Sequence, residues 1–137
     1  MNTGIILCGV GGQGTVLASK LISASAMENG LSVMSAETIG MAQRGGSVTS
    51  HIRIGEGVYS PMIAFGGADT IIGFEPGEAA RMLPFLKEGG SVVVSSGVVI
   101  PVTEALVRSD YSSENMVGYL REHVERLTVV DTDTAIR

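Results

Sequence analysis

A glycine-rich turn near the N-terminus is the strongest candidate for chemistry in this sequence. Gly9, Gly11 and Gly14 fit the pattern G-x-G-x-x-G, with Gly12 and Gln13 between them. In such a turn the first glycine permits a tight reversal and the second lets backbone N–H groups approach an anion, while the third lets a helix pack closely on a sheet. The N-terminus of the following helix adds partial positive charge. The spacing therefore predicts a cofactor-binding turn for a phosphate or a carboxylate.

Glu37 is the candidate partner of this turn if the ligand is a dinucleotide. It follows a predicted strand over 31–36, near the ~20-residue offset of a carboxylate that binds a ribose hydroxyl. The phosphate-binding loop of nucleotide triphosphatases does not fit, because Gly14 is followed by Thr15 rather than by lysine. A free-standing dinucleotide-binding Rossmann module is therefore one functional hypothesis.

A second glycine-containing loop carries candidate substrate or interface residues. Gln43, Arg44, Gly45 and Gly46 follow the predicted strand at its carboxyl end, where open α/β sheets bind ligands. The planar guanidinium of Arg44 suits a carboxylate or a phosphate. The alternative is a surface turn with a solvated arginine, and the sequence pattern leaves both interpretations open.

His51 is a further candidate for a substrate or interface contact. Residues 47–54 alternate strictly, which places His51 and Arg53 on one side of a predicted strand. A histidine there could act as an acid–base group or contact a substrate carboxylate. The simpler interpretation is a polar face that meets solvent or another subunit, because no nucleophile or metal partner is evident. No residue is assigned a catalytic role, and no metal site is predicted.

Cys8 is the single cysteine of the chain and is expected in the core. Alone it can form no internal disulfide and cannot hold an iron–sulfur cluster or a zinc ion.

The elements that position these residues indicate an α/β fold, a Rossmann-like three-layer domain with a mostly parallel sheet. Strands are predicted over 5–8, 31–36, 47–54, 70–74, 91–96 and 127–131. A possible antiparallel hairpin joins 47–54 to 58–61 across a glycine turn. Helices are predicted over 16–27, over 78–87 with a kink or break at Pro84, and from Ser112 or Ser113 onward. Residues 98–107 resist assignment, and 132–137 would open one more helix.

Two local features of these helices are predicted as well. The first helix is expected to bury an apolar stripe that includes Val16, Leu17, Leu21 and Ile22. Glu75 lies at a strand end near the crevice, and its commoner role is that of a carboxylate at a helix start.

Composition narrows the class of protein. The chain has 137 residues, enough for a single domain over 1–137 with a real core. Hydrophobic residues make up 45% and charged residues 17%, which indicates heavily buried strands or a surface for a partner. A net charge of −5 without a basic cluster argues against nucleic acid. No apolar run reaches the ~18 residues of a membrane span, and no targeting segment is present, so a cytoplasmic protein is expected.

Two motifs carry a resemblance to a known family. The turn over 9–14 and the run Ala42-Gln43-Arg44-Gly45-Gly46-Ser47-Val48 resemble the gamma-type subunit of the 2-oxoacid:ferredoxin oxidoreductases. The run 43–47 and the segment 50–53 are most similar to the indolepyruvate branch, where this subunit is often called beta. The similarity covers nearly the whole chain. Family members usually continue past the last strand with another helix and a short strand, so a C-terminus truncated relative to the family is expected.

The resemblance implies a function that this chain shares with partner subunits. The family oxidatively decarboxylates a 2-oxoacid to an acyl-CoA and passes electrons to ferredoxin. Thiamine diphosphate and the iron–sulfur clusters belong to the partner subunits or domains of a hetero-oligomer. By this resemblance the turn over 9–14 would bind part of coenzyme A, and the loop over 43–46 would face the thiamine site across the interface. A purely structural subunit, whose glycine turn only packs helix on sheet, is the third hypothesis.

Overall fold

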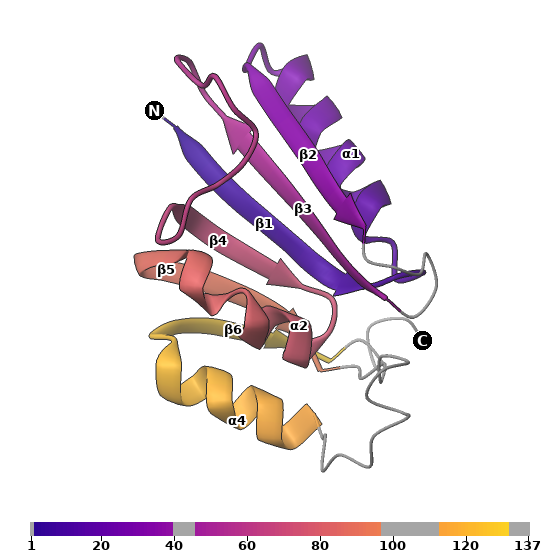
Figure 1. Cartoon of the computed structure of the whole chain (residues 1–137), viewed down its shortest axis with the longest axis vertical. Helices are drawn as coiled ribbons and strands as arrows, with labels where there is room; N and C mark the ends of the chain where they lie inside the picture. Colours follow the sequence, from indigo (N-terminus) through magenta and orange to yellow (C-terminus); the bar gives the residue numbers. More distant parts are fainter. Residues whose placement is uncertain (1, 40–45, 97–112, 132–137) are drawn as a thin grey trace.

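A mixed β-sheet forms the centre of the protein (Figure 1). The computed structural model describes residues 2–39, 46–96 and 113–131. Within them the sheet has six strands in the order β2-β3-β1-β4-β5-β6. The strands are β1 (Thr3–Val10), β2 (Val33–Ile39), β3 (Ser47–Ile54), β4 (Ala68–Gly73), β5 (Leu86–Ser95) and β6 (Arg126–Val130). The pairs β1–β4, β4–β5 and β5–β6 are parallel, and β3 is antiparallel to both of its neighbours. The predicted α/β class with a mostly parallel sheet is confirmed.

The pairing of β3 corrects the predicted hairpin. Residues 58–61 form no strand, and β3 instead lies between β1 and β2. Thr3 pairs with Ile54 on one side, and Val33 pairs with the same residue on the other. A central position buries Ile52 completely and gives β3 two hydrogen-bonded neighbours, whereas a two-stranded hairpin would leave one edge unpaired. Long-range pairing therefore displaces the local hairpin.

Helices cover both faces of the sheet. They are α1 (Thr15–Glu28), α2 (Pro76–Arg81) and α4 (Ser113–His123), with a short 3-10 helix η1 (Leu83–Phe85) after α2. Thr15 of α1 lies against Gly9, and Ala79 of α2 lies against Gly73. Gly73 pairs with Cys8, the neighbour of Gly9, and adjacent strand residues point to opposite faces. The two helices thus lie on opposite sides, which makes a three-layer arrangement.

The core is concentrated under α2 and α4. Its fully buried members include Ile6, Ile71, Val92, Val94 and Leu120. Cys8 belongs to the same cluster and is 0% exposed, so its predicted core position is confirmed. Burial raises the pKa of the Cys8 thiol far above its ordinary value. This thiol is therefore inert packing rather than a ligand facing the crevice.

The helix break near Pro84 is also confirmed. α2 ends at Arg81 and η1 follows, with Pro84 inside η1. Pro84 has no N–H to donate to a helix interior, so the chain makes one tight turn and enters β5.

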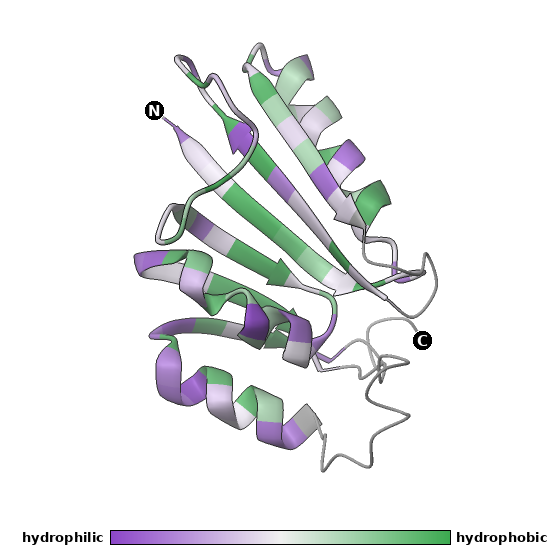
Figure 2. Cartoon of the chain, viewed as in Figure 1, coloured by the Kyte–Doolittle hydropathy of each residue, from purple (hydrophilic) through white to green (hydrophobic). Residues whose placement is uncertain are grey.

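The buried face of α1 differs from the predicted apolar stripe. The residues it buries are small, namely Thr15, Ser19, Ser23 and Ala26. Leu17 and Leu21 are each 62% exposed, and Figure 2 shows apolar segments along this helix beside β2. Small side chains allow the helix to approach the sheet closely, and this close approach decides which side faces inward.

Candidate ligand-binding site at the strand ends

The glycine turn between β1 and α1 is held by the side chain of Gln13. Its Oε1 accepts a hydrogen bond from the N–H of Val10 at 2.6 Å, and its Nε2 donates to the carbonyl of Phe74 at 3.3 Å. The backbone N–H of Gln13 also donates to the carbonyl of Val10 at 3.2 Å. Gln13 therefore joins the ends of β1 and β4 and fixes the shape of the turn.

The glycines of the turn have tasks different from those the pattern assigns. A Cβ at Gly9 would lie 2.7 Å from Gln13 Oε1 and 2.8 Å from Thr15 Oγ1, so Gly9 serves close packing. Gly12 and Gly14 have φ of 95° and 90°, and open space surrounds both. Gly14 is the N-cap of α1. The left-handed backbone at these two positions, rather than at Gly9, makes the reversal possible.

The second loop meets the first through one backbone hydrogen bond. The N–H of Gly11 donates to the carbonyl of Gly46 at 2.8 Å. Gly46 therefore lies beside the turn, as expected for two loops at neighbouring strand ends. Gln43, Arg44 and Gly45 fall outside the described residues.

A small hollow lies against the glycine turn and the start of α1. It has a volume of about 210 Å³ and is lined by Val10, Gly11, Gly12, Gly14, Thr15, Val16, Leu17 and Val48. The first N–H groups of α1 have no carbonyl partner within the helix, and the helix dipole favours a negative charge there. Thr15 is 3% exposed, and its Oγ1 has no hydrogen-bond partner among the described residues. The hollow suits one phosphate or carboxylate group with an apolar neighbour, and it is smaller than a site for a whole drug-sized ligand.

A buried carboxylate cluster lies near the same strand ends, and the sequence pattern revealed only part of it. Glu75 is 0% exposed and caps α2, because its Oε2 accepts from the N–H of Glu78 at 2.9 Å. This confirms its expected place at a helix start. Ser47 Oγ donates to Glu78 Oε1 at 2.9 Å, and Arg81 Nη1 lies 3.2 Å from the same oxygen. Glu78 and Arg81 were missed, although the sequence Glu-Pro-Gly-Glu carries the signal of a capped helix start.

Burial shifts the pKa of the Glu75 carboxyl. Desolvation raises its pKa above the ordinary value, while the N–H groups of Glu78 and Gly77 oppose the shift. Its Oε1 has no hydrogen-bond partner among the described residues. The helix cap through Oε2 explains why the carboxyl is tolerated inside the protein.

Glu37 does not occupy the position that a dinucleotide site requires. It lies within β2 and pairs with Ser50, and β3 separates its strand from β1. In a dinucleotide-binding unit the ribose carboxylate ends the strand next to the glycine turn. The antiparallel insertion of β3 therefore contradicts the arrangement that the spacing had suggested.

His51 is an interior residue rather than part of a surface face. It is 4% exposed, its Nδ1 accepts from the N–H of Ile63 at 3.0 Å, and its ring packs edge-on against Phe85. Burial lowers the pKa of His51. The expectation of a face meeting solvent or a subunit is wrong here, because the segment before β4 folds back over this side of β3.

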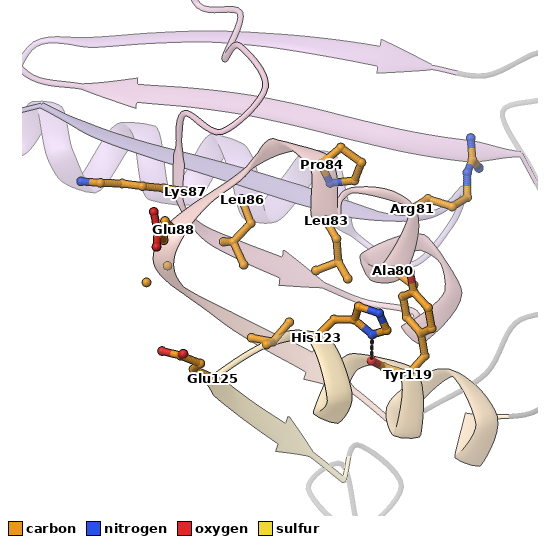
Figure 3. A pocket seen from close by; sticks show the side chains of 13 residues that line it. Ala80, Arg81, Leu83, Pro84, Leu86, Lys87, Glu88, Tyr119, His123 and Glu125 are labelled. Atoms are coloured by element: carbon orange, nitrogen blue, oxygen red, sulfur yellow. Dashed lines mark hydrogen bonds between the residues drawn. The ribbon is translucent and has the colours of Figure 1, made fainter.

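A larger hollow of about 530 Å³ lies at the opposite ends of the strands, between η1 and α4 (Figure 3). Tyr119 and His123 stack there with ring centroids 4.1 Å apart, and His123 Nδ1 lies 2.8 Å from the carbonyl of Tyr119. Lys87 and Glu125 at its rim carry opposite charges. These groups do not converge on one point, so no reaction is assigned to this hollow.

Two negative findings apply to the described part of the chain. It contains no group of three or more histidine, cysteine, aspartate or glutamate side chains that could hold a metal ion. It also contains no helix with the length and apolarity needed to cross a membrane.

The fold and the site together define a Rossmann-like α/β domain with a glycine turn at its strand ends. The turn and the hollow beside it lie at the carboxyl end of β1.

Comparison with known proteins identifies the family. The model of the family described as pyruvate ferredoxin/flavodoxin oxidoreductase matches residues 4–134, and the chain belongs to this family. It is 42% identical over 132 residues to indolepyruvate oxidoreductase subunit IorB of Archaeoglobus fulgidus, covering 96% of this chain and 65% of that protein. The subunit of the same name from Methanothermobacter thermautotrophicus is 45% identical over 111 residues, covering 81% of this chain and 55% of that protein. The chain thus spans less than two thirds of the length of these relatives.

Solved structures show the same fold. Pyruvate oxidoreductase subunit PORC from Thermotoga maritima superposes with a TM-score of 0.65 at 21% sequence identity, covering 98% of this chain and 65% of that chain. The predicted resemblance to this family and the predicted Rossmann-like fold are therefore confirmed.

Proposed function

We propose that this chain acts as a gamma-type subunit of a 2-oxoacid:ferredoxin oxidoreductase. The substrate would be an aryl pyruvate such as indolepyruvate, converted to an acyl-CoA with electrons passed to ferredoxin. The observation that carries the proposal is family membership over residues 4–134, together with relatives above 40% identity that are named as indolepyruvate oxidoreductase subunits.

The chain's own contribution would be to bind an anionic part of coenzyme A and to help close the active site. The hollow at the start of α1 offers backbone N–H groups that suit a phosphate. The Thr15 hydroxyl, which is buried and has no partner among the described residues, would turn to donate to the same group. The hydrogen bond between Gly11 and Gly46 links this turn to the loop that carries Arg44. Arg44 would then face the partner's reaction centre.

The redox groups of the complex would be held by partner subunits. Thiamine diphosphate would supply the decarboxylation chemistry, and iron–sulfur clusters would carry the electrons. Clusters need several cysteine ligands, and the one cysteine of this chain is buried in the core. The chain therefore fits the role of a binding and closing subunit.

Native co-purification of the chain from its own cells tests the assembly. We expect a brown complex that contains a larger partner, iron–sulfur absorbance and releasable thiamine diphosphate. A colourless chain that purifies alone would contradict the proposal.

A pair of substitutions on α1 tests the role of the hollow. Thr15→Val removes the hydroxyl at nearly constant volume, and it should raise KM for coenzyme A about ten-fold, the effect of losing one hydrogen bond to a charged group. Ser23→Ala is the matched control, because Ser23 on the same helix is also buried and unpaired but does not line the hollow. Equal KM values in both variants would exclude Thr15 from the ligand site.

Arg44→Ala tests the second loop in the assembled complex. We expect slower turnover with unchanged assembly, measured by the reduction of ferredoxin. Unaltered kinetics for both the 2-oxoacid and coenzyme A would remove Arg44 from the proposed site.

A further inference from the structure

The strands β1 and β4 separate at their carboxyl ends. Their last paired residues are Cys8 and Gly73, and the N–H of Phe74 then donates to the carbonyl of Cys8 at 2.8 Å. In a regular parallel ladder the next hydrogen bond would run from the N–H of Val10 to the carbonyl of Phe74. Both of these groups are instead bonded to the side chain of Gln13, at 2.6 Å and 3.3 Å.

The amide of Gln13 takes the place of the next hydrogen bond in the ladder. Its Oε1 accepts as a backbone carbonyl would, and its Nε2 donates as a backbone N–H would. Because a whole amide group lies between them, Val10 and Phe74 are held farther apart than a direct hydrogen bond would hold them. The side chain thus sets how far β1 and β4 separate at the glycine turn.

The internal hydrogen bonds of the turn use three of its N–H groups. Val10 donates to Gln13 Oε1, Gly11 donates to the carbonyl of Gly46, and Gln13 donates to the carbonyl of Val10. Two of these three bonds involve Gln13. The paired N–H groups are therefore not available to a ligand.

The N–H groups of Gly12 and Gly14 remain for a ligand. Neither has a hydrogen-bond partner within the described ranges 2–39, 46–96 and 113–131. Both residues line the hollow of about 210 Å³ at the start of α1, whereas Gln13, which lies between them in the sequence, does not. Gln13 instead contacts the end of β4 through the carbonyl of Phe74.

We propose that Gln13 is a positioning residue of the glycine turn. Its amide orients the backbone of Gly12 and Gly14 toward the ligand, and no atom of its side chain contacts the ligand. This role differs from the direct cofactor binding that the glycine pattern suggests. The inference rests on the proposed binding of coenzyme A at this turn, and it names the residue that shapes that site.

The chemistry of the inserted group makes the proposal testable by substitution. Asparagine is one methylene shorter, and methionine has a similar length but neither the acceptor nor the donor. An ionised glutamate has two acceptors, whereas a protonated glutamate has one acceptor and one O–H donor, as the amide has. Substitutions at Gln13 can therefore remove the two hydrogen bonds and, in one case, restore them.

Gln13→Met in the assembled complex tests the effect on the ligand. Methionine fills a similar space without the hydrogen bonds, so KM for coenzyme A should rise about ten-fold, the effect of losing about one hydrogen bond. The kcat at saturating coenzyme A and KM for the 2-oxoacid should not change, because only the turn is altered. Glu122→Met, at an exposed position of α4, is the control. An unchanged KM for coenzyme A in Gln13→Met would overturn the positioning role.

Gln13→Glu adds a test by rescue. Its ionised carboxylate faces the carbonyl of Phe74 with a second acceptor, so KM for coenzyme A should be raised at about pH 8. As the pH falls to about 5, the carboxyl approaches the range in which glutamate binds a proton. The ratio of this KM to that of the unmodified complex should then fall, while the same ratio for Gln13→Met stays constant. Identical pH profiles for the two variants would contradict the inserted hydrogen bonds.

Amide hydrogen exchange in the 137-residue chain tests the inserted amide without any ligand. The N–H of Val10 should exchange about ten-fold faster in Gln13→Met, because its acceptor is lost while the methionine still keeps the strands apart. The N–H of Ile6 within β1 should keep its protection in both proteins. Equal exchange at Val10 would show that Gln13 does not hold this group.

A titration with coenzyme A followed by NMR separates positioning from direct contact. The backbone amide resonances of Gly12 and Gly14 should shift, and the side-chain amide protons of Gln13 should not. Shifts of the Gln13 amide protons as large as those of the two glycines would overturn the positioning role alone. No shift anywhere in the turn would contradict coenzyme A binding itself, and this inference with it.

Discussion

Helices α4 and α1 meet the same sheet in opposite ways. On one face, α4 and the residue after it bury Leu120 and Val124, which interlock with the apolar side chains of the sheet. On the other face, α1 buries small residues such as Ser19 and exposes Leu21. The comparison shows that a helix can be held by close backbone approach instead of by large apolar side chains. Its leucines then remain available for another molecule.

The largest expected effect contrasts one leucine from each helix. Leu120 is 0% exposed, so Leu120→Ala should leave a cavity and lower the free energy of unfolding by about 2–5 kcal/mol. Leu21→Ala should change it by no more than about 0.5 kcal/mol, as for other surface positions. Urea unfolding at a protein concentration low enough to avoid association measures both. Equal losses would mean that α1 uses its leucines for the fold after all.

The next effect tests the close approach of α1. Ser19 is 1% exposed, and Ser19→Leu should lower the free energy of unfolding by about 1–3 kcal/mol because the added atoms have no space. Ala24→Leu adds the same side chain on the exposed face of α1 and should have little effect on the monomer. A tolerated Ser19→Leu would show that the helix can move away from the sheet at little cost.

The stability of the protein should depend on pH through His51. This residue pairs with Ile6 on the face of the sheet that α2 and α4 cover. Burial lowers the pKa of His51, and its Nδ1 must stay unprotonated to accept from the N–H of Ile63. The unfolded chain binds the proton more readily, so stability should fall as the pH drops below about 6.5. His51→Asn, which keeps an acceptor oxygen and cannot titrate, should flatten this dependence in urea midpoints measured between pH 5 and 7 (about the range in which histidine titrates).

The titration of Glu75 changes the free energy of unfolding in the direction opposite to that of His51. The experiment must therefore distinguish the contributions of the two groups. Its raised pKa means that the unfolded carboxyl loses its proton first, so stability falls as the pH rises above the ordinary value of 4.5. The pH ranges in which Glu75 and His51 affect stability overlap at mildly acidic pH. A pH profile that His51→Asn leaves unaltered would assign the acid sensitivity elsewhere.

The smallest expected changes in the free energy of unfolding concern Asp69 near the start of β4 and Lys87 near the start of β5. Asp69 accepts from the N–H of Gly4 at 2.8 Å and lies 3.5 Å from Lys87 Nζ. Asp69→Ala should lower the free energy of unfolding by about 1 kcal/mol, because a partly buried N–H loses its partner. Lys87→Ala removes only an exposed ion pair and should change it by less than about 0.5 kcal/mol. Thermal unfolding at low and high salt compares them, and a larger loss for Lys87→Ala would reverse the assignment.

Strand positions were predictable because a run of β-branched residues such as Val92 to Val94 indicates a buried strand, whichever strand lies beside it. The partner of a strand was not predictable in the same way. The segment 47–54 alternates as well for a hairpin as for a central strand, and only the rest of the sheet decides between them. For this reason the expected hairpin was wrong although the strand itself was right.

The orientation of α1 could not be read from hydrophobicity. The pattern ranks Leu17 and Leu21 as core residues above Ser19 and Ser23, yet the serines are buried and the leucines are exposed. Thr15, on the same buried side, lies against Gly9 of the sheet. Glycine spacing predicted the turn correctly, but the tasks of its glycines depend on contacts with Gln13 and Thr15. Tertiary contacts of this kind have no signature in a local pattern.

The placement of β3 has a consequence for the order in which the protein can be assembled. β1 is synthesised first, yet one of its neighbours is β3 and the other is β4. The pairing of β1 with β3, from Val10 with Ser47 to Thr3 with Ile54, must therefore wait until residue 54 has left the ribosome. Until then the apolar residues of β1 lack their sheet partners, which slows folding and favours aggregation. The nascent β1 is thus exposed to aggregation until β3 and β4 have followed it.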